Sequence, residues 1–386
     1  MNIQKVMLVS HHAHPQIVTG AEKALLMFGS ACQSVHLEVL WISPTPGLSY
    51  ERAIQMGMDT RLVSFPFLWN LIYNPNELVE ELSIFQQAAD DSELNEVIAT
   101  YSPDLIVSNS AINGMPALIA RKRKIPVWWY IHEVIPKLDG IDRFLSMIHS
   151  HSDRVLVPSM TVAQSISQGN NTASSVQLLP YGVEIPSYPS LIGNRQKVRN
   201  QNGWTYNHVV IGWFGSVYQG KGLLELIRAC SFLKNQEKTI ILLAAGNIGD
   251  PGYFNVCQEE AKLLESVEFR YLGALPHIEE VLASVDMVVV PSIVEEAFPN
   301  VALEAMSFGK PVVAFESGGL KEIVVNGETG LLAGTGDIVL LSSYIQDLVH
   351  ESAKRVRMGT KGRKRAVNLF RKEIFQRRVQ KIIQQK

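Results

Sequence analysis

The sequence predicts an α/β protein built from two doubly wound parallel sheets. Short, continuous runs of Val, Ile and Leu recur along the chain, and such runs are typical of strands that are buried on both faces. Helical stretches separate most of these runs, which is the βαβ pattern of parallel sheets. Because 386 residues allow about two domains, the pattern predicts two such sheets, one after the other.

The strand candidates fall into two sets on either side of a polar segment. The first set comprises residues 6–10, 37–42, 105–108, 127–131, 155–158 and 176–179, and the second comprises residues 209–214, 240–245, 269–272, 287–290 and 312–315. Residues 188–206 are polar, contain Pro and Gly and lack periodicity, which predicts a linker. We therefore expect a domain over residues 1–187, a hinge over 188–206, a second domain over 207–365 and a helix over 366–386.

The composition is that of an ordinary globular protein. Hydrophobic residues make up 46%, charged residues 19%, and the net charge is −2, which argues against disorder and against a nucleic-acid partner. Three distant cysteines form no metal or disulfide motif, so a reducing, cytoplasmic location is expected. The apolar start of the chain fits a first strand better than a signal peptide. No apolar run is long enough to cross a bilayer.

Positive charge is concentrated in two places. Residues 354–386 contain thirteen Lys or Arg and one acidic residue, Glu373, and residues 121–124 form a second basic run. One interpretation is that these are solvated helix faces. The other is contact with an anionic membrane surface, which would make the protein peripheral on the cytoplasmic face of the membrane.

The most informative segment places Glu296 and Glu304 eight positions apart across a loop-to-helix junction. A strand precedes it, Pro299 suits the first helical position, and Gly309 suits the helix end. The helix start between the two carboxylates offers free N–H groups and a positive dipole end, where anions bind. A ligand that is anionic at one end and rich in hydroxyls at the other, such as a sugar nucleotide, suits this pattern.

A glycine-rich turn from Gly215 to Gly222 follows the first strand of the second set. Gly215, Gly220 and Lys221 nearly match a phosphate-binding P-loop, but Gly222 stands where a Mg²⁺-binding Ser or Thr is expected. Three interpretations of this turn remain open: a phosphate site that does not depend on an NTP, a P-loop NTPase, and an ordinary strand-to-helix turn. Residues 317–322 form a third loop at a strand end, where open α/β sheets bind ligands.

The first half has fewer candidates. His11, His12 and His14 are either metal ligands or polar loop residues near a cleft, and no matching Cys or carboxylate cluster supports a metal. His132 follows a buried strand, where it is either a proton donor or acceptor or a satisfied buried histidine. Residues 19–22 suit a helix start. The sequence contains neither an Asp-x-Asp motif nor a Gly-x-Ser-x-Gly elbow.

Together these segments resemble the retaining glycosyltransferases of family 4, which have the GT-B fold. The resemblance is strongest over residues 209–332 and extends more weakly over nearly the whole chain. It rests on the Glu296–Glu304 spacing and on the surrounding residues, which are Pro291-Ser292, Glu304-Ala305-Met306, Gly309-Lys310-Pro311-Val312-Val313, Gly318-Gly319 and Gly327-Glu328-Thr329-Gly330-Leu331. Residues 19–22, His132 and residues 179–184 fit the family as well.

The resemblance implies two Rossmann-like domains that face a cleft, with the acceptor on the first, the donor on the second and the last helix packed back on the first. The donor would be a UDP-, GDP- or ADP-sugar, the acceptor a glycan or lipid-linked hydroxyl, and neither cofactor nor metal would be needed. The implied catalytic residues are Lys221, Glu296 and His132. The implied donor-binding residues are Gly20, Gly215, Ser216, Lys221, Glu296, Phe298, Pro299, Asn300, Val301 and Glu304.

The resemblance implies a specific role for four of these residues. Lys221 would neutralise the leaving diphosphate, Glu304 would bind the ribose, and Glu296 would bind hydroxyls of the donor sugar, while His132 would line the sugar site. No carboxylate nucleophile is evident opposite the sugar, so direct attack on the same face, with retention, is the expected mechanism.

Three positions depart from the family pattern. Ser216 stands where Arg is frequent, Tyr181 where Asn is common, and Thr19 where a glycine is common. A missing arginine would weaken stabilisation of the leaving group and lower activity, unless Arg228, Lys310 or a residue of the first domain compensates. Two alternatives to a glycosyltransferase are therefore a sugar-nucleotide epimerase and a catalytically weak homologue that binds sugar nucleotides.

Overall fold

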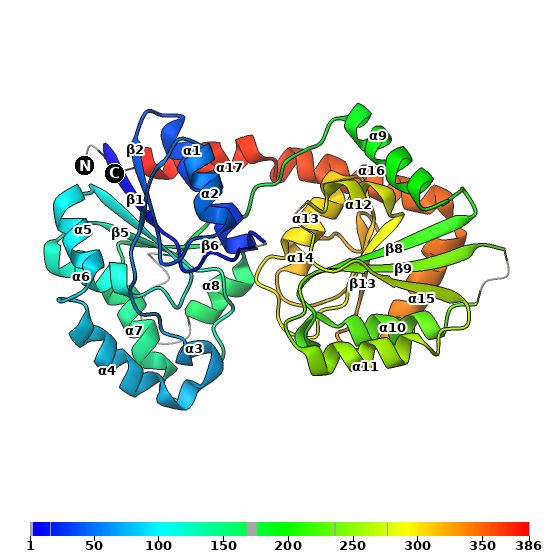
Figure 1. The fold of residues 1–386 in the computed structure, drawn as a ribbon, viewed down its shortest axis with the longest axis horizontal. Coiled ribbons are helices and arrows are strands. Elements are labelled where there is room, and N and C mark those ends of the chain that lie inside the picture. Colours follow the sequence, from blue (N-terminus) through cyan, green and yellow to red (C-terminus); the bar gives the residue numbers. More distant parts are fainter. Residues whose placement is uncertain (1–2, 16, 168–175, 235–236, 276, 386) are drawn as a thin grey trace. The chain divides into compact units, whose positions relative to one another are not determined.

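The protein forms two compact α/β units in a computed structural model that describes residues 3–15, 17–167, 176–234, 237–275 and 277–385 (Figure 1). The first unit contains Met1–Gly182 and Glu373–Lys386, and the second contains Val183–Lys372. Each unit has one parallel sheet, as the sequence predicts.

The first unit has a seven-stranded parallel sheet in the order β3-β2-β1-β4-β5-β6-β7. Its strands are β1 Lys5–Val9, β2 Glu38–Ser43, β3 Asp59–Leu62, β4 Leu105–Asn109, β5 Val127–Tyr130, β6 Arg154–Val157 and β7 Val176–Leu178. The six predicted strands of this unit are present. β3 was not predicted, because this edge strand is largely exposed and reads Asp-Thr-Arg-Leu, without an apolar run.

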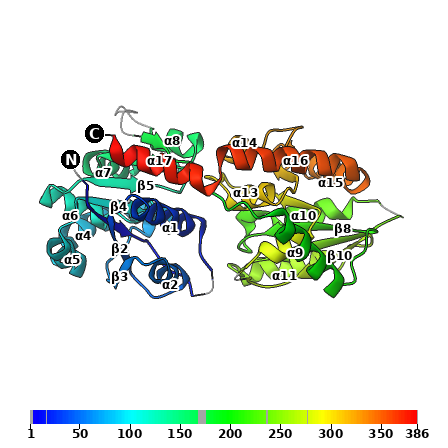
Figure 2. The ribbon, with the colours of Figure 1, turned by 90° about the horizontal axis from the view of Figure 1, so that it is seen from above.

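The helices of the first unit cover both faces of this sheet (Figure 1). They are α1 Gly20–Gln33, α2 Leu48–Gln55, α3 Asn70–Tyr73, α4 Leu78–Ala88, α5 Glu93–Tyr101, α6 Met115–Arg123, α7 Ile141–His151, α8 Met160–Ile166 and the C-terminal α17 Lys372–Gln384. Figure 2 shows α17 beside α1. The amide of Gln376 donates to Ser30 Oγ of α1 at 3.1 Å, and the amide of Gln380 donates at 2.9 Å to Oγ of Ser34, the C-cap of α1. The predicted return of the last helix to the first unit is thus confirmed.

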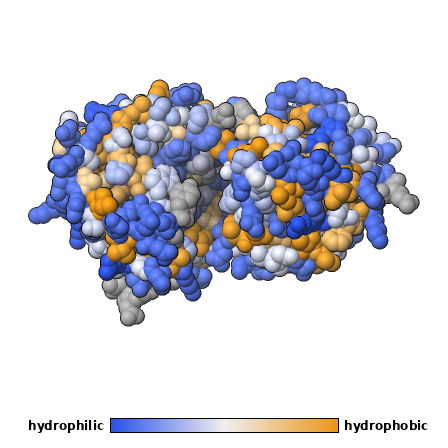
Figure 3. Space-filling view, turned by 60° about the horizontal axis from the view of Figure 1, so that its bottom comes forward, coloured by the Kyte–Doolittle hydropathy of each residue, from blue (hydrophilic) through white to orange (hydrophobic). Residues whose placement is uncertain are grey.

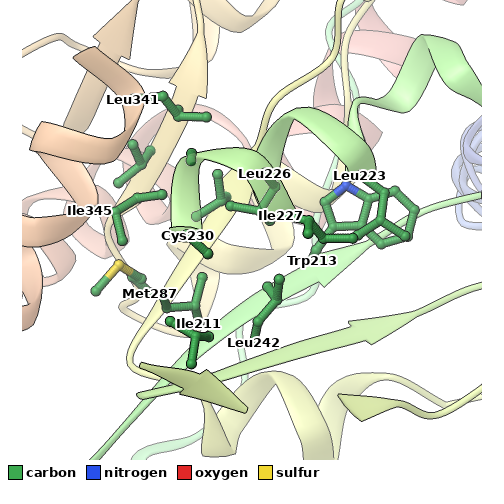
Figure 4. Packing of buried hydrophobic residues seen from close by; sticks show 14 of the residues in the cluster. Ile211, Trp213, Leu223, Leu226, Ile227, Cys230, Leu242, Met287, Leu341 and Ile345 are labelled. Carbon is green, nitrogen blue, oxygen red and sulfur yellow. The ribbon is translucent and has the colours of Figure 1, made fainter. Parts of the chain in front are cut away.

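The second unit has a six-stranded parallel sheet in the order β10-β9-β8-β11-β12-β13. Its strands are β8 His208–Phe214, β9 Thr239–Ala245, β10 Val267–Tyr271, β11 Met287–Val290, β12 Val312–Phe315 and β13 Gly330–Ala333. Ile211, Trp213 and Leu242 of the sheet pack against Leu226 and other residues of α10 and α15 (Figure 4). β13 was not predicted, because its sequence, Gly-Leu-Leu-Ala, has only two large apolar residues and follows a turn.

The helices of the second unit are α9 Tyr188–Gln201, α10 Leu223–Ser231, α11 Pro251–Ala261, α12 Glu279–Ser284, α13 Asn300–Ser307, α14 Leu320–Ile323, α15 Ile338–His350 and α16 Ser352–Leu369. The segment over 188–206, which was predicted as a linker from its polar sequence, is mostly helical, because α9 occupies residues 188–201. Arg195 and Arg199 of α9 bind Asp286 at 2.6 and 3.1 Å and also bind carbonyl groups at the end of α12. Polar anchors of this kind leave no apolar periodicity in the sequence.

The basic C-terminal run has a structural use within the described residues. Arg355 donates to the carbonyls of Leu348 and Val349 at the end of α15, and Arg365 donates to those of Glu322 and Ile323 in α14. Cations at helix C-termini satisfy unpaired carbonyls and oppose the helix dipole. Arg363 likewise donates to Ser307 O at the end of α13. Much of this charge therefore stabilises the fold.

No helix in the described part of the chain is long and apolar enough to span a membrane. Hydrophobic residues are scattered among hydrophilic ones on the face drawn in Figure 3.

Candidate functional site

Three loops meet at the carboxyl edge of the six-stranded sheet. They follow β8, β11 and β12, and parallel strands bring their carboxyl ends to one edge. The N–H of Ile293 donates to Gly220 O at 3.0 Å, and the N–H of Gly319 donates to Glu296 O at 2.6 Å. The three glycine- and glutamate-bearing segments that the sequence singles out are thus joined by backbone hydrogen bonds.

The centre of this edge is an ion pair between Lys221 and Glu296. Lys221 Nζ lies 2.6 Å from Glu296 Oε1, which also accepts a hydrogen bond of 2.5 Å from Ser292 Oγ. Glu296 is only 8% exposed, and Trp213 Nε1 holds the Lys221 carbonyl at 3.2 Å. Burial lowers the pKa of Lys221, but the Glu296 carboxylate and Tyr218 together outweigh burial, so the pKa of Lys221 is raised. Lys221 is therefore a fixed cation at neutral pH.

Glycine at position 222 is required by close packing. Gly222 has φ of +70°, and a Cβ there would lie 1.8 Å from Pro291 O. A Ser or Thr that could hold Mg²⁺ does not fit without a backbone shift, so the structure argues against the P-loop NTPase interpretation. Gly318 and Gly319 are similar, because a Cβ on either would lie 2.2 or 2.1 Å from a carbonyl of the Glu296 loop. The loop after β12 therefore packs closely against the backbone of the loop after β11 that carries Glu296.

The helix α13 begins between the two carboxylates. Pro299 is its N-cap rather than its first helical residue, a shift of one position from the prediction. Asn300 and Val301 are the first helical residues, and Glu304 is half-buried in the second turn. The helix ends as predicted: Gly309 has φ of +68° and its N–H donates to Met306 O at 2.9 Å.

The side chain of Phe298 does not face an open site. It is 4% exposed, and its ring lies 5.8 Å from the ring of Phe370 in an edge-to-face contact. Any contact from this position to a ligand would come from its backbone.

Ser216 lies directly after Gly215 at the same sheet edge and is half-buried, with Oγ 2.6 Å from Asn247 Oδ1. The suggestion that Lys310 or Arg228 supplies the charge missing at Ser216 is wrong. Lys310 Nζ binds Ala283 O at 2.6 Å and Val285 O at 2.8 Å, which precede β11 at the opposite edge of the sheet. Arg228 faces Glu260 of α11 at 3.5 Å.

His132 lies at the carboxyl edge of the seven-stranded sheet, after β5, and both of its ring nitrogens have partners. Nδ1 is 2.7 Å from Tyr181 Oη, and Nε2 is 2.7 Å from Asn109 Oδ1. Burial, assisted by His11, holds the pKa of His132 well below 6.5. Of the two interpretations left open, the structure favours the satisfied, neutral histidine.

The half-buried carboxylate of Glu133 holds the loops around His132. Glu133 accepts from the N–H of Ala111 at 2.8 Å and from the N–H of His132 at 3.0 Å.

Gly20 is the first residue of α1, where Thr19 and Glu22 form a reciprocal capping box. The described residues contain no group of His, Cys, Asp or Glu that could hold a metal.

Four polar partners in these two loop clusters were not identified as site residues from the sequence: Asn109, Ser110, Asn247 and Ser292. Each directly follows a strand or lies within a residue or two of its end, which is the signal that could have found them.

Comparison with known families places both halves of the chain. Residues 194–365 match the model "Glycosyl transferases group 1", and residues 18–185 match the model "Glycosyltransferase Family 4". Structures of HepE of Anabaena with UDP and glucose, and with UDP-glucose, share the fold, with TM-scores of 0.79 and 0.78 at 20% and 21% identity. Each alignment covers 98% of this chain and 99% of HepE, so the GT-B fold is confirmed.

Curated relatives are distant in sequence. The chain is 27% identical over 288 residues to a sulfoquinovosyl transferase of Arabidopsis thaliana, covering 69% of this chain and 54% of the plant protein. It is 28% identical over 285 residues to a lipopolysaccharide 1,2-N-acetylglucosaminetransferase of Salmonella typhimurium, covering 72% of this chain and 71% of that protein. A capsular polysaccharide glycosyltransferase of Staphylococcus aureus is 27% identical over 172 residues, 44% of either chain. Apart from the Salmonella protein, the chain spans about half the length of these relatives.

Proposed function

Because the chain belongs to the group 1 and family 4 glycosyltransferases, we propose that it transfers a sugar from a nucleotide diphosphate donor to an acceptor hydroxyl, with retention of anomeric configuration. The observation that carries this proposal is the Lys221–Glu296 pair beside the start of α13. It combines a fixed cation, a carboxylate and a helix N-terminus at one sheet edge. This combination suits a ligand with a diphosphate and sugar hydroxyls.

The diphosphate is the leaving group, so negative charge grows on it as the bond to the sugar breaks. Lys221 is charged at neutral pH and its ammonium has three N–H donors. With the N–H groups at Asn300 and Val301 it would stabilise that charge. Preorganised donors of this kind are worth about 3–4 kcal/mol each in transition-state stabilisation.

The hydroxyl-binding roles fall to the carboxylates. Glu304, half-buried in the second turn of α13, would bind the ribose. Glu296 would bind hydroxyls of the sugar, while its Oε1 keeps hold of Lys221 and Ser292. Gly20, Gly215 and Ser216 would approach the donor through backbone and hydroxyl groups. Pro299 would set the start of α13.

The acceptor oxygen would attack the anomeric carbon from the face that the diphosphate leaves. As the C–O bond to the acceptor forms, the bond to the diphosphate breaks and the acceptor proton passes to a departing phosphate oxygen. No metal takes part in this sequence. The ligands of HepE favour a UDP-sugar as donor, with GDP- and ADP-sugars as the other members of the class. The relatives' names favour a glycan or a lipid-linked acceptor, in polysaccharide or glycolipid biosynthesis.

A cytoplasmic location has support from three buried free cysteines. The membrane contact expected from the basic runs has less support, because Arg355, Arg363 and Arg365 of α16 bind helix-terminal carbonyls. Sedimentation with anionic and neutral liposomes at low salt tests it. Pelleting only with anionic liposomes would restore a peripheral location.

The proposed function is tested by donor turnover. Purified protein is incubated with UDP-, GDP- and ADP-sugars in EDTA, and the released nucleoside diphosphate is measured. We expect release from one donor, reduced at least about 100-fold in Lys221→Ala and Glu296→Ala. Lys262→Ala is the matched control, because Lys262 is exposed and pairs with Glu259 at 2.7 Å on the surface.

Other outcomes separate the alternatives. Release that neither site variant reduces would contradict the assignment of this edge. A changed sugar on an intact nucleotide would indicate an epimerase. Donor binding in a thermal-shift assay without release, even with candidate acceptors added, would favour a catalytically weak homologue. Ser216 gives that candidate its support, since neither Lys310 nor Arg228 replaces the missing charge.

A further inference from the structure

Asn247 carries an unused pair of hydrogen-bond donors at the carboxyl edge of the six-stranded sheet. It lies just beyond the end of β9, and its Oδ1 accepts a hydrogen bond of 2.6 Å from Ser216 Oγ. Because the amide oxygen faces Ser216, the amide nitrogen points away from it. Among the described residues Asn247 Nδ2 has no hydrogen-bond partner, and it is not one of the buried side-chain atoms that lack one. Its two N–H groups are therefore open to solvent.

The backbone at Asn247 is fixed against the loop that follows β8. The N–H of Val217 donates to Asn247 O at 2.8 Å, and the N–H of Gly215 donates to Ala245 O at 3.0 Å. The two loops also approach closely, because a Cβ on Gly246 would lie 1.6 Å from Gly215 O. With its backbone held in this way and its amide oxygen bound to a hydroxyl, the Asn247 side chain has one set direction before any ligand arrives.

The groups at this position favour an anionic ligand. An amide N–H₂ group can only donate hydrogen bonds, and phosphate oxygens only accept them. Ser216 has a single O–H, which it gives to Asn247, so its hydroxyl has no proton left for a phosphate oxygen. Lys221 lies further along the same loop as Ser216 and is a cation held by Glu296. An amide donor pair and an ammonium group on neighbouring loops suit the oxygens of one diphosphate.

We propose that Asn247 binds a phosphate oxygen of the nucleoside diphosphate through its Nδ2 N–H groups, and that Ser216 is a positioning residue that acts through Asn247. The inference rests on the proposed function, because it adds one contact to the diphosphate of that donor and moves the hydroxyl contact of Ser216 to Asn247. Asn247 thereby supplies hydrogen-bond donors, although no charge, beside the position where Ser216 replaces an arginine.

The contact is tested by the binding of UDP, GDP and ADP to the full chain, measured by isothermal titration calorimetry at low salt. Asn247→Ala removes the donors, and we expect the Kd of the nucleotide that binds to rise about tenfold, as for a lost hydrogen bond to a charged group. Asn247→Asp keeps an acceptor for Ser216 but puts a carboxylate oxygen in place of the N–H₂ group. It should bind about tenfold more weakly than Asn247→Ala, because the carboxylate repels the diphosphate.

Asn255→Asp is the matched control, because Asn255 is exposed on α11 and undergoes the same change of charge. An Asn247→Asp variant that binds no more weakly than Asn247→Ala overturns the phosphate contact, since a ribose hydroxyl tolerates a carboxylate and a phosphate does not. Unchanged binding in Asn247→Ala also overturns the inference and leaves the proposed function intact. If the wild type binds none of the three nucleotides, the proposed function fails and the inference fails with it.

The positioning role of Ser216 is tested by a double-mutant cycle. Ser216→Ala should raise the Kd about 2- to 5-fold in the wild type, because the Asn247 amide is then free to turn, and should have no further effect in Asn247→Ala. Ser216→Thr keeps the hydroxyl and should bind like the wild type. Equal effects of Ser216→Ala in both backgrounds would mean that Ser216 contacts the ligand itself, which overturns its positioning role.

Discussion

Replacing Gly222 with serine would complete the P-loop consensus of the turn after β8, and the structure predicts that it destabilises the second unit instead. Gly222 has φ of +70°, and a Cβ would lie 1.8 Å from Pro291 O and 2.7 Å from Pro291 C. Both atoms belong to the backbone of the Glu296 loop, so no side-chain rotation relieves the overlap. The two loops must move apart, and Lys221 moves with them.

The magnitude follows from two contributions. A left-handed conformation costs a residue with a Cβ about 1–2 kcal/mol. Forcing extra atoms into a well-packed region costs about 1–3 kcal/mol more. The sum is about 2–5 kcal/mol, and for a unit of this size it corresponds to a fall in Tm of about 4–20 °C.

Differential scanning calorimetry of the full chain measures the effect, with Gly222→Ala as the substitution that adds only Cβ. Gly327→Ala is the matched control, because Gly327 has φ of +77° with nothing within 4 Å, and should show the conformational contribution alone. Gly334→Ala meets nothing within 4 Å and should leave Tm nearly unchanged. If Gly222→Ala lowers Tm no more than Gly327→Ala, the packing argument is refuted. ATP hydrolysis gained by Gly222→Ser would refute it as well.

Three further predictions concern charge and hydrogen bonding. Ser216→Arg should raise donor turnover about 10- to 100-fold by adding a cation near the diphosphate. Ser216→Ala is its control, because it loses only the 2.6 Å hydrogen bond to Asn247. Unchanged turnover in Ser216→Arg would contradict the charge argument. Ser292→Ala should lower donor turnover about 3- to 10-fold, because Glu296 loses a 2.5 Å hydrogen bond. The decrease should be the same with and without EDTA. Unchanged kinetics would show that Lys221 alone positions Glu296. Burial, with Arg195 adding to it, lowers the pKa of Lys310 from 10.5 to about 7. Between pH 7 and 10.5 Lys310 is protonated in the unfolded chain but largely neutral in the folded one, so the unfolded chain binds more protons than the folded chain. The free energy of unfolding, measured by urea denaturation, should therefore rise with pH by up to about 1.4 kcal/mol per pH unit. Lys310→Met removes the titrating group and should flatten this rise.

Much of the fold could be predicted because hydrophobic periodicity is local. The strands β1, β4 and β8 each contain a run of apolar residues rich in Val, Ile or Leu, and burial on both faces selects such runs wherever they occur. β3 and α9 were missed for the complementary reason. β3 is an exposed edge strand, and α9 is anchored by arginines, so neither has an apolar pattern to read.

For the candidate site, the sequence predicted which loops form it but not which of their side chains pair with each other. Glycines and carboxylates at strand ends indicated the loops, because parallel strands bring their carboxyl ends together whatever the details of packing. The pairing of Lys221 with Glu296 was not predictable, since 75 positions separate them and both were expected to face the ligand instead.

The sequence by itself determined two parallel sheets, the family and the loops that bear Lys221, Glu296 and Glu304, because these follow from patterns within short segments. Only the tertiary structure decided which polar groups are already paired. It showed that His132 lies between Tyr181 and Asn109, and that arginines of α16 bind helix-terminal carbonyls. A polar side chain is satisfied by whichever partner the fold brings within hydrogen-bond distance, and that partner can lie anywhere along the chain.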